Sequence, residues 1–303
     1  MQTQRLSHRT SECHVSYEKI TPTARLHDER VVMIHGAAHT SACYLRTPDG
    51  RPSWAYDFAQ KGYEVFVPDW PGCGQSDPIA LELHDGARIV AGLASLLEEI
   101  GGGVILVTHS MAGPYGWKLA ELCNSIITRV IAVAPGPMGN IQEHSKILHE
   151  SSDELTIRFL GNELTLDRAA PFSYSDAGAR EKMIGDRSQH FPREYASEYL
   201  ASLHPIAPQL MHERCNVRGS QLRVDDFRAL SKIKFAVITG TDDLDHPPEL
   251  DQQIVTYLLS HGISADFIDL GSRGIVGNGH MLMLEKNSSA IASIMLEWLH
   301  NTL

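Results

Sequence analysis

The sequence predicts an α/β fold with a mostly parallel central sheet. Six short apolar runs recur along the chain, and turn residues and then a helix-like stretch follow them. Strands that alternate with helices are typical of right-handed βαβ units. The runs are almost continuously apolar, which indicates strands that are buried on both faces of the sheet. They lie at residues 31–34, 63–67, 104–107, 130–133, 235–238 and 265–270.

One long segment interrupts this rhythm. Between Pro137 and about Leu222 there are helix-like stretches, clearest at 153–166 and 194–203, and no convincing core strand. The segment is too long for a plain loop and follows the sixth strand by our count, so we interpret it as a cap or lid over an active site. The predicted domains are an α/β core at 1–137 and 223–303 and a helical cap at 138–222.

Composition argues against several classes of partner. The 303 residues include 37 acidic and 26 basic side chains, a formal net charge of -11, without a cluster of Lys or Arg. An acidic surface without a basic stripe argues against nucleic acid and anionic membranes as partners. We expect a small-molecule substrate, and a homodimer stays open.

The cysteines and the first residues predict the compartment. Residues 1–16 lack the apolar core of a signal peptide, and no apolar run is long enough to span a bilayer. The five cysteines are scattered without CxxC spacing, which favours free thiols in a reducing environment. A cytoplasmic protein is therefore the expectation.

Residues 104–113 are the most informative segment. The apolar run 104–107 leads into Ser110, which has small residues two positions away on each side, Thr108 and Ala112. A sharp strand-to-helix turn strains the serine backbone and requires small neighbours, and it exposes the serine Oγ above the N-terminus of the next helix. The helix-like stretch 114–124 follows as this turn requires, so we predict that Ser110 is a nucleophile rather than a helix N-cap.

A second loop suggests an oxyanion hole. His35-Gly36-Ala37-Ala38 follows the third strand by our count. The backbone N–H groups of Ala37 and Met111 would stabilise the negative charge of a tetrahedral intermediate, with Ala38 as the alternative to Ala37. We interpret the loop at residues 69–76 as structural.

The base and the acid of a triad should follow the later strands. Of 16 histidines, His280 is the best placed, in a Gly-Asn-Gly-His loop between the last strand and a C-terminal amphipathic helix. His109 should point away from the serine Oγ, and His35 is interpreted as a loop-bracing residue. The acid should follow the seventh strand, where Gly-x-x-Asp spacing favours Asp243, with Asp242 and Asp245 as alternatives.

With these residues the sequence resembles the α/β-hydrolase superfamily along nearly its whole length, and most closely a branch of bacterial serine esterases. The stretches that carry the resemblance are 47–54, 61–69, 108–110 and 277–283. The resemblance implies an α/β-hydrolase fold with a cap. It also implies a triad acid that is a Glu directly before Pro-Gly after the sixth strand. That position is Ala134 here, and Ala37 and Ala38 replace two cysteines of the branch.

The alanine at position 134 has three interpretations. In the first, the triad acid has moved to Asp243 or a neighbouring aspartate. In the second, the enzyme works without a triad acid. In the third, the scaffold performs chemistry other than hydrolysis. Migration is favoured because three aspartates stand at the alternative position.

The resulting prediction is a serine-dependent hydrolase of carboxylic esters or lactones that works through an acyl-enzyme. A non-hydrolytic lyase, cyclase or decarboxylase of natural-product type is the alternative, and a binding module is a third class. No cofactor and no metal are expected. The predicted apolar contacts of a medium-sized substrate are Ala38, Trp70, Met138 and Met281, together with Met111 and, less favoured, Met283.

Overall fold

A twisted eight-stranded sheet forms the centre of the protein. The computed structural model describes residues 1–302. The strand order is β1-β2-β4-β3-β5-β6-β10-β11. The pairs β1–β2 and β2–β4 are antiparallel, and all other neighbouring pairs are parallel. The strands are β1 (Gln2–Arg9), β2 (His14–Thr21), β3 (Arg30–Ile34), β4 (Glu64–Pro68), β5 (Val104–His109), β6 (Ile127–Val133), β10 (Lys234–Thr239) and β11 (Ala265–Asp269).

All six strands predicted from apolar runs are confirmed, and so is the α/β-hydrolase fold class. Our strand count allowed for two strands before residue 31, but no apolar run predicted where these two antiparallel edge strands, β1 and β2, would lie. Nearly every residue of β1 is exposed, so this strand has no apolar pattern to reveal it. By contrast, every residue of β4 and β5 is buried, as expected for strands covered on both faces.

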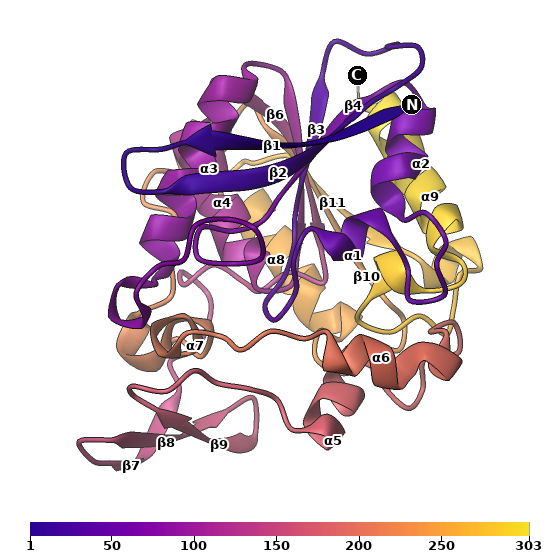
Figure 1. Ribbon diagram of the computed structural model, residues 1–303. Helices are drawn as coiled ribbons and strands as arrows, with labels where there is room; N and C mark the ends of the chain where they lie inside the picture. Colours follow the sequence, from indigo (N-terminus) through magenta and orange to yellow (C-terminus); the bar gives the residue numbers. More distant parts are fainter. Residues whose placement is uncertain (303) are drawn as a thin grey trace.

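Helices cover both faces of the sheet (Figure 1). Side chains of α3, α4 and α8 share one hydrophobic cluster with one face of the strands, and α2 and α9 share a second cluster with the other face. In β5, Leu106 belongs to the first cluster while Ile105 and Val107 belong to the second, which is the alternation of a strand. The helices are α1 (Ala42–Leu45), α2 (Trp54–Gln60), α3 (Gly86–Ile100), α4 (Ala112–Leu122), α5 (Asp176–Ala179), α6 (Ala196–Ala201), α7 (Pro208–Arg214), α8 (Pro248–Ser260) and α9 (Ser288–Asn301).

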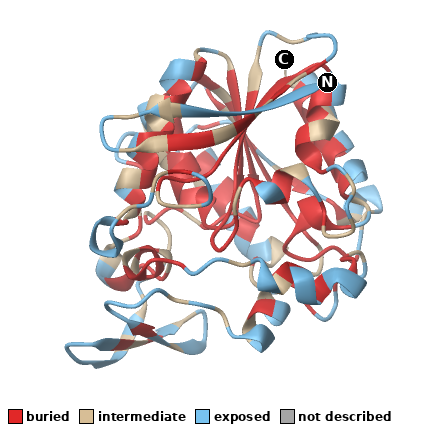
Figure 2. Cartoon of the chain, viewed as in Figure 1, coloured by how far each residue is buried: buried red, intermediate tan, exposed pale blue. Residues whose placement is uncertain are grey.

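The segment between β6 and β10 lies across the end of the sheet at which the parallel strands finish (Figure 1). It contains α5, α6, α7 and a small antiparallel sheet of β7 (Lys146–Glu150), β8 (Glu154–Phe159) and β9 (Asn162–Asp167). This small sheet is mostly exposed (Figure 2). Single helical turns occur at Leu81–Leu83, Arg180–Ile184, Arg193–Tyr195, Val217–Gly219, Phe227–Leu230, Gly271–Arg273 and Leu282–Leu284; the second of these is π-helical.

The prediction of a helix at 153–166 was wrong, because this stretch is the β8–β9 hairpin. Leu155 and Ile157 are buried while their neighbours are more exposed, which is the two-residue period of a strand. Leu160 and Gly161 form the turn with φ of 48° and 85°, a pair of left-handed residues that suits a tight hairpin. The predicted helix at 194–203 is confirmed in α6. Division into a core and a cap at residues 138–222 stays a proposal.

None of the helices within residues 1–302 combines the length and the apolar character that crossing a bilayer requires.

Candidate active site

Ser110 directly follows β5 in the sharp turn that leads into α4. Its φ is 51°, in the left-handed region that costs a non-glycine residue energy. Three backbone hydrogen bonds hold it there: its N–H donates to Val133 O at 3.0 Å, and its carbonyl accepts from the N–H groups of Gly113 and Gly136, both at 2.8 Å. The strained conformation predicted for this serine is therefore present and firmly supported.

Small residues around the turn prevent collisions. A Cβ on Gly36 would lie 3.1 Å from the Cβ of Ser110, and one on Gly113 would clash with the carbonyl of Gly136. One helical turn later, a Cβ on Gly116 would lie 2.7 Å from Thr108 Cγ2. Close packing of α4 on β5 and on the loop after β6 thus depends on Gly116 and Gly113.

The structure brings Ser110, His280 and Asp243 together in a hydrogen-bonded series. Ser110 Oγ lies 3.0 Å from His280 Nε2, and His280 Nδ1 donates to Asp243 Oδ2 at 2.8 Å. Both distances suit a nucleophile, base and orienting acid. The side chains of His280 and Asp243 are 1% and 0% exposed. His109 instead donates through Nε2 to the carbonyl of His280 at 3.1 Å, so it braces the loop that carries the histidine.

The three neighbouring aspartates have different partners. Asp243 uses its second oxygen to accept the N–H groups of Asp245 and His246 at 2.9 and 3.0 Å. Asp242 accepts the N–H of Gly277 at 3.0 Å and so ties two loops together. Asp245 forms ion pairs with cationic side chains, described below. Only Asp243 among these three is hydrogen-bonded to His280.

Burial dominates the electrostatics of the pair. It raises the pKa of Asp243 to about 6. Burial also lowers the pKa of His280 well below its ordinary value, and the positive charge of Lys182 lowers it further. At neutral pH the imidazole is consequently neutral and able to accept a proton, and Asp243 is ionised and able to stabilise the resulting imidazolium.

The loop after β3 and the start of α4 supply the proposed oxyanion donors. Within residues 1–302, the N–H groups of Ala37 and Met111 have no hydrogen-bond acceptor. Two bonds fix the loop: His39 Nδ1 donates to Ala37 O at 2.8 Å, and the N–H of His204 donates to Ala38 O at 2.9 Å. Ala38 has a φ of 61°. The amides of Ala37 and Met111 are therefore free to bind a developing oxyanion, and that of the alternative donor Ala38 likewise has no acceptor within residues 1–302.

A cavity of about 610 Å³ lies next to this site, within the size range of small-molecule pockets. The core contributes Met111, which also carries one of the proposed oxyanion amides. Most of the remaining wall comes from the segment between β6 and β10, including Ile141, Phe159 and Leu160. The sequence did not reveal Phe159 and Leu160, because the hairpin that carries them was interpreted as a helix, and Ile141 lies in an irregular stretch before β7. A second cavity of about 460 Å³ is lined by residues that include His39, Tyr199 and His204.

Four of the predicted substrate contacts line neither cavity. Met138 and Met281 are completely buried in hydrophobic clusters, and Ala38 is almost so. Trp70 stacks on His35 with ring centroids 4.6 Å apart, and the N–H of Trp70 donates to His35 Nε2 at 3.2 Å. His35 is thus a bracing residue, as expected. A role of the four residues in substrate binding stays a prediction.

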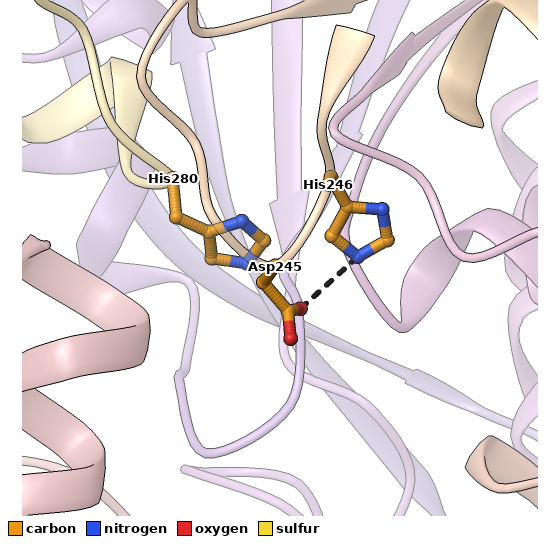
Figure 3. Close-up of side chains that lie close together, drawn as sticks. All are labelled: Asp245, His246 and His280. Atoms are coloured by element: carbon orange, nitrogen blue, oxygen red, sulfur yellow. Dashed lines mark ion pairs between the residues drawn. The ribbon is translucent and has the colours of Figure 1, made fainter. Parts of the chain in front are cut away.

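Asp245, His246 and His280 could superficially be read as a metal site (Figure 3). One potential ligand atom from each lies within 4.8 Å of the others. However, Asp245 already pairs with Lys182 and Arg214, and both ring nitrogens of His280 are engaged in the series described above. Two resident cations and an occupied imidazole favour an ion-pair cluster at this place over metal binding.

Comparison with known proteins assigns the family. The model of the alpha/beta hydrolase family matches residues 31–294. The protein belongs to the alpha/beta hydrolase family. A fungal protein (strain ATCC 74256) named probable secreted lipase phiG is 25% identical over 341 aligned positions, which cover 89% of this chain and 81% of the relative.

Solved structures agree on the fold of this hydrolase. DcsB in complex with a substrate analogue has a TM-score of 0.65 and 15% identity, with 99% of each chain covered. A thermophilic esterase from Thermogutta terrifontis has a TM-score of 0.60 and 15% identity, with 98% of each chain covered. At such identities the likeness concerns the fold alone. The predicted superfamily is confirmed, and its relatives include a lipase and esterases.

Proposed function

We propose that this hydrolase cleaves a carboxylic ester or a lactone through an acyl-enzyme on Ser110. The observation that carries the proposal is the series Ser110–His280–Asp243, with distances of 3.0 and 2.8 Å at the end of a strained strand-to-helix turn. A binding module would need neither an activated serine nor a buried base. The lipase named among the relatives supports an ester substrate.

The acylation half follows from these contacts. Ser110 Oγ attacks the ester carbonyl as His280 Nε2 takes its proton, and Asp243 stabilises the imidazolium. The amides of Ala37 and Met111 bind the oxyanion of the tetrahedral intermediate. As the intermediate collapses, His280 returns the proton to the leaving alcohol, and the acyl group remains on Ser110. Water then attacks the acyl-enzyme with His280 again as base, which releases the acid and regenerates the serine.

The cavity beside Met111 indicates the size of the substrate. A volume of about 610 Å³ accommodates a medium-sized molecule, and Pro114, Ile141 and Phe159 provide apolar wall. A medium-sized and fairly apolar acyl or alcohol group is therefore proposed.

Covalent labelling tests the nucleophile. Wild type and His280→Ala are exposed to a fluorophosphonate, and intact mass and peptide mapping locate the adduct. Stoichiometric labelling at Ser110 that depends on His280 would support the acyl-enzyme, and a panel of esters and lactones would follow. Absence of labelling under conditions that modify a control serine hydrolase would refute the mechanism.

A cyclase is the second candidate, because the nucleophile and base are almost fully buried. Ser110 is 4% exposed and His280 2% exposed, so water has limited access to an acyl group on the serine. A hydroxyl of the same substrate could then replace water as the attacking group. Product analysis with a hydroxyacyl ester distinguishes the two, since hydrolysis yields the free acid and cyclisation a lactone. The lyase and decarboxylase alternatives depend on the alanine at position 134, where the resemblance implies the triad acid. The hydrogen bond between His280 and Asp243 argues against them, because it supplies an acid from another position.

Location and assembly stay predictions. All five cysteines are free, which fits the expected cytoplasmic location, whereas the fungal relative is named a secreted lipase. A small-molecule substrate, the absence of nucleic-acid and membrane partners, and a homodimer likewise remain proposals.

A further inference from the structure

A cluster of buried charges lies against His280 and does not belong to the triad. Two of its residues, Asp245 and His246, follow Asp243 in the loop after β10. The others come from different parts of the chain. The charge cluster consists of Asp245, His246, Asp251 at the start of α8, Lys182 in the π-helical turn, and Arg214 at the end of α7.

Asp245 is the centre of the charge cluster. Its carboxylate pairs with Lys182, with Arg214 at 3.0 Å and with His246 Nε2 at 3.2 Å. Lys182 and Arg214 both belong to the segment between β6 and β10, and each side chain is 11% exposed. The loop that carries the triad acid is therefore tied directly to the proposed cap.

His246 is a cation in this setting. Its Nδ1 faces Asp251 Oδ1 at 3.3 Å. Although burial opposes its charge, Asp251 and Asp245 together raise the pKa of His246 to about 9. The ring of His246 stacks on that of His280 with centroids 5.3 Å apart and planes 16° apart (Figure 3).

The charges balance only while His280 is neutral. Lys182, Arg214 and His246 are positive, and Asp243, Asp245 and Asp251 are negative. Without the three cations, Asp245 would be a bare carboxylate within 4.8 Å of a His280 nitrogen. Such an anion would stabilise imidazolium and compete with Asp243 for it.

The remaining ionisable groups that face His280 carry no charge. His109 lies with its ring centroid 4.7 Å away, and burial lowers its pKa well below the ordinary value. Burial lowers the pKa of His39 to about 3. Neither neutral ring can replace the cations of the charge cluster.

We propose that Lys182 and His246 are positioning residues that neutralise Asp245, so that His280 stays uncharged and bonded to Asp243. Because Lys182 belongs to the proposed cap, the base strength of His280 depends on the cap being in place. This inference rests on the proposed role of His280 as general base.

Titration of His280 itself tests the proposal. The protein is labelled with ¹³C at histidine Cε1, and the His280 signal is assigned by its loss in His280→Gln. The charge-removing variants are Lys182→Gln and His246→Gln, and each has a matched charge-keeping control, Lys182→Arg and His246→Lys. We expect both Gln variants to raise the midpoint of the His280 titration by about one pH unit or more, and both controls to titrate close to wild type.

Asp245→Asn should shift the midpoint of the His280 titration in the opposite direction. Loss of this anion leaves the cations uncompensated, so the His280 midpoint should fall. Thermal unfolding of each variant verifies that it is folded. Gln variants that titrate as wild type, or charge-keeping controls that shift as far as the Gln variants, would overturn the inference.

The titration requires no turnover, which separates the two proposals. If the midpoints move as expected while Ser110 is not labelled by fluorophosphonate, the proposed hydrolysis fails and the charge cluster stands. If labelling of Ser110 depends on His280 and the His280 midpoints do not move, the proposed hydrolysis stands and the proposed role of the charge cluster fails.

Discussion

Asp243 accepts a hydrogen bond from His280 Nδ1 at 2.8 Å, between loops that follow the neighbouring parallel strands β10 and β11. Ala134 directly follows β6, which lies on the other side of β10, and its N–H donates to Ile238 O of β10 at 2.8 Å. The carboxyl ends of β6 and β10 are therefore adjacent in the sheet. The bond from His280 to Asp243 on the neighbouring strand end favours migration of the acid over its loss.

Replacing Asp243 should remove the orienting acid and little else. We expect Asp243→Asn to lower kcat by about 10⁴-fold, because the amide no longer stabilises the imidazolium or selects the tautomer. Asp242→Asn is the matched control, since an amide oxygen can still accept the N–H of Gly277. Steady-state kinetics of wild type and both variants with the same ester measures the two losses in kcat. Equal losses in the two variants would contradict the assignment.

The rate should depend on pH through the Asp243–His280 pair. Burial raises the pKa of Asp243 to about 6, and activity requires this carboxylate ionised and His280 neutral. As the pH falls below about 6, kcat/KM should therefore decrease about tenfold per pH unit, with an apparent value that belongs to the pair. A profile measured with an uncharged ester provides the check. A flat profile down to pH 4.5 would be incompatible with this pair as base and acid.

Packing under the nucleophile turn predicts a compensating pair of mutations. The new Cβ of Gly116→Ala would lie 2.7 Å from Thr108 Cγ2, so the variant should lose about 1–3 kcal/mol of unfolding free energy. Thr108→Ser removes Cγ2, and in that background Gly116→Ala should cost much less. Gly102→Ala is the control, because nothing lies within 4 Å of its added Cβ. Denaturant unfolding of the four-member cycle measures the coupling, and additive losses would refute the contact.

Glu213 should make stability depend on pH. Its Oε2 accepts the N–H of Gly86, the first residue of α3, at 2.8 Å, and burial raises the pKa of Glu213 from 4.5 to about 7. A raised pKa favours the protonated form in the folded state. The contribution of Glu213 to stability is therefore complete below about pH 4.5 and is lost as the pH rises through about 7, by at most about 3 kcal/mol.

The variant Glu213→Gln keeps an acceptor for Gly86 and has no charge to lose. We expect it to be more stable than wild type at pH 8 and similar to it at pH 5. Urea unfolding at the two pH values measures the difference. The same stability difference at both would show that Glu213 does not titrate in this range.

The sequence predicted the interior strands because burial on both faces leaves a local signature. It missed β1, whose exposed residues carry no such signature, and it misassigned 153–166. In that hairpin Leu155, Ile157 and Leu166 are buried at strand spacing, but two short apolar sets separated by a turn are hard to distinguish from one amphipathic helix.

The sequence by itself determined the α/β framework and placed Ser110 in the turn after one strand and His280 in the loop after the last strand, because a sharp turn and a glycine-rich loop are local features of the chain. Tertiary structure alone decided which aspartate faces the histidine. Asp242, Asp243 and Asp245 have the same chemistry within four residues, and their roles differ only through partners far along the chain: Gly277 for the first, His280 for the second, and Lys182 with Arg214 for the third. The Gly-x-x-Asp spacing favoured Asp243, but long-range pairing of charges leaves no pattern in the neighbouring sequence, so only the folded arrangement gives each aspartate its partner.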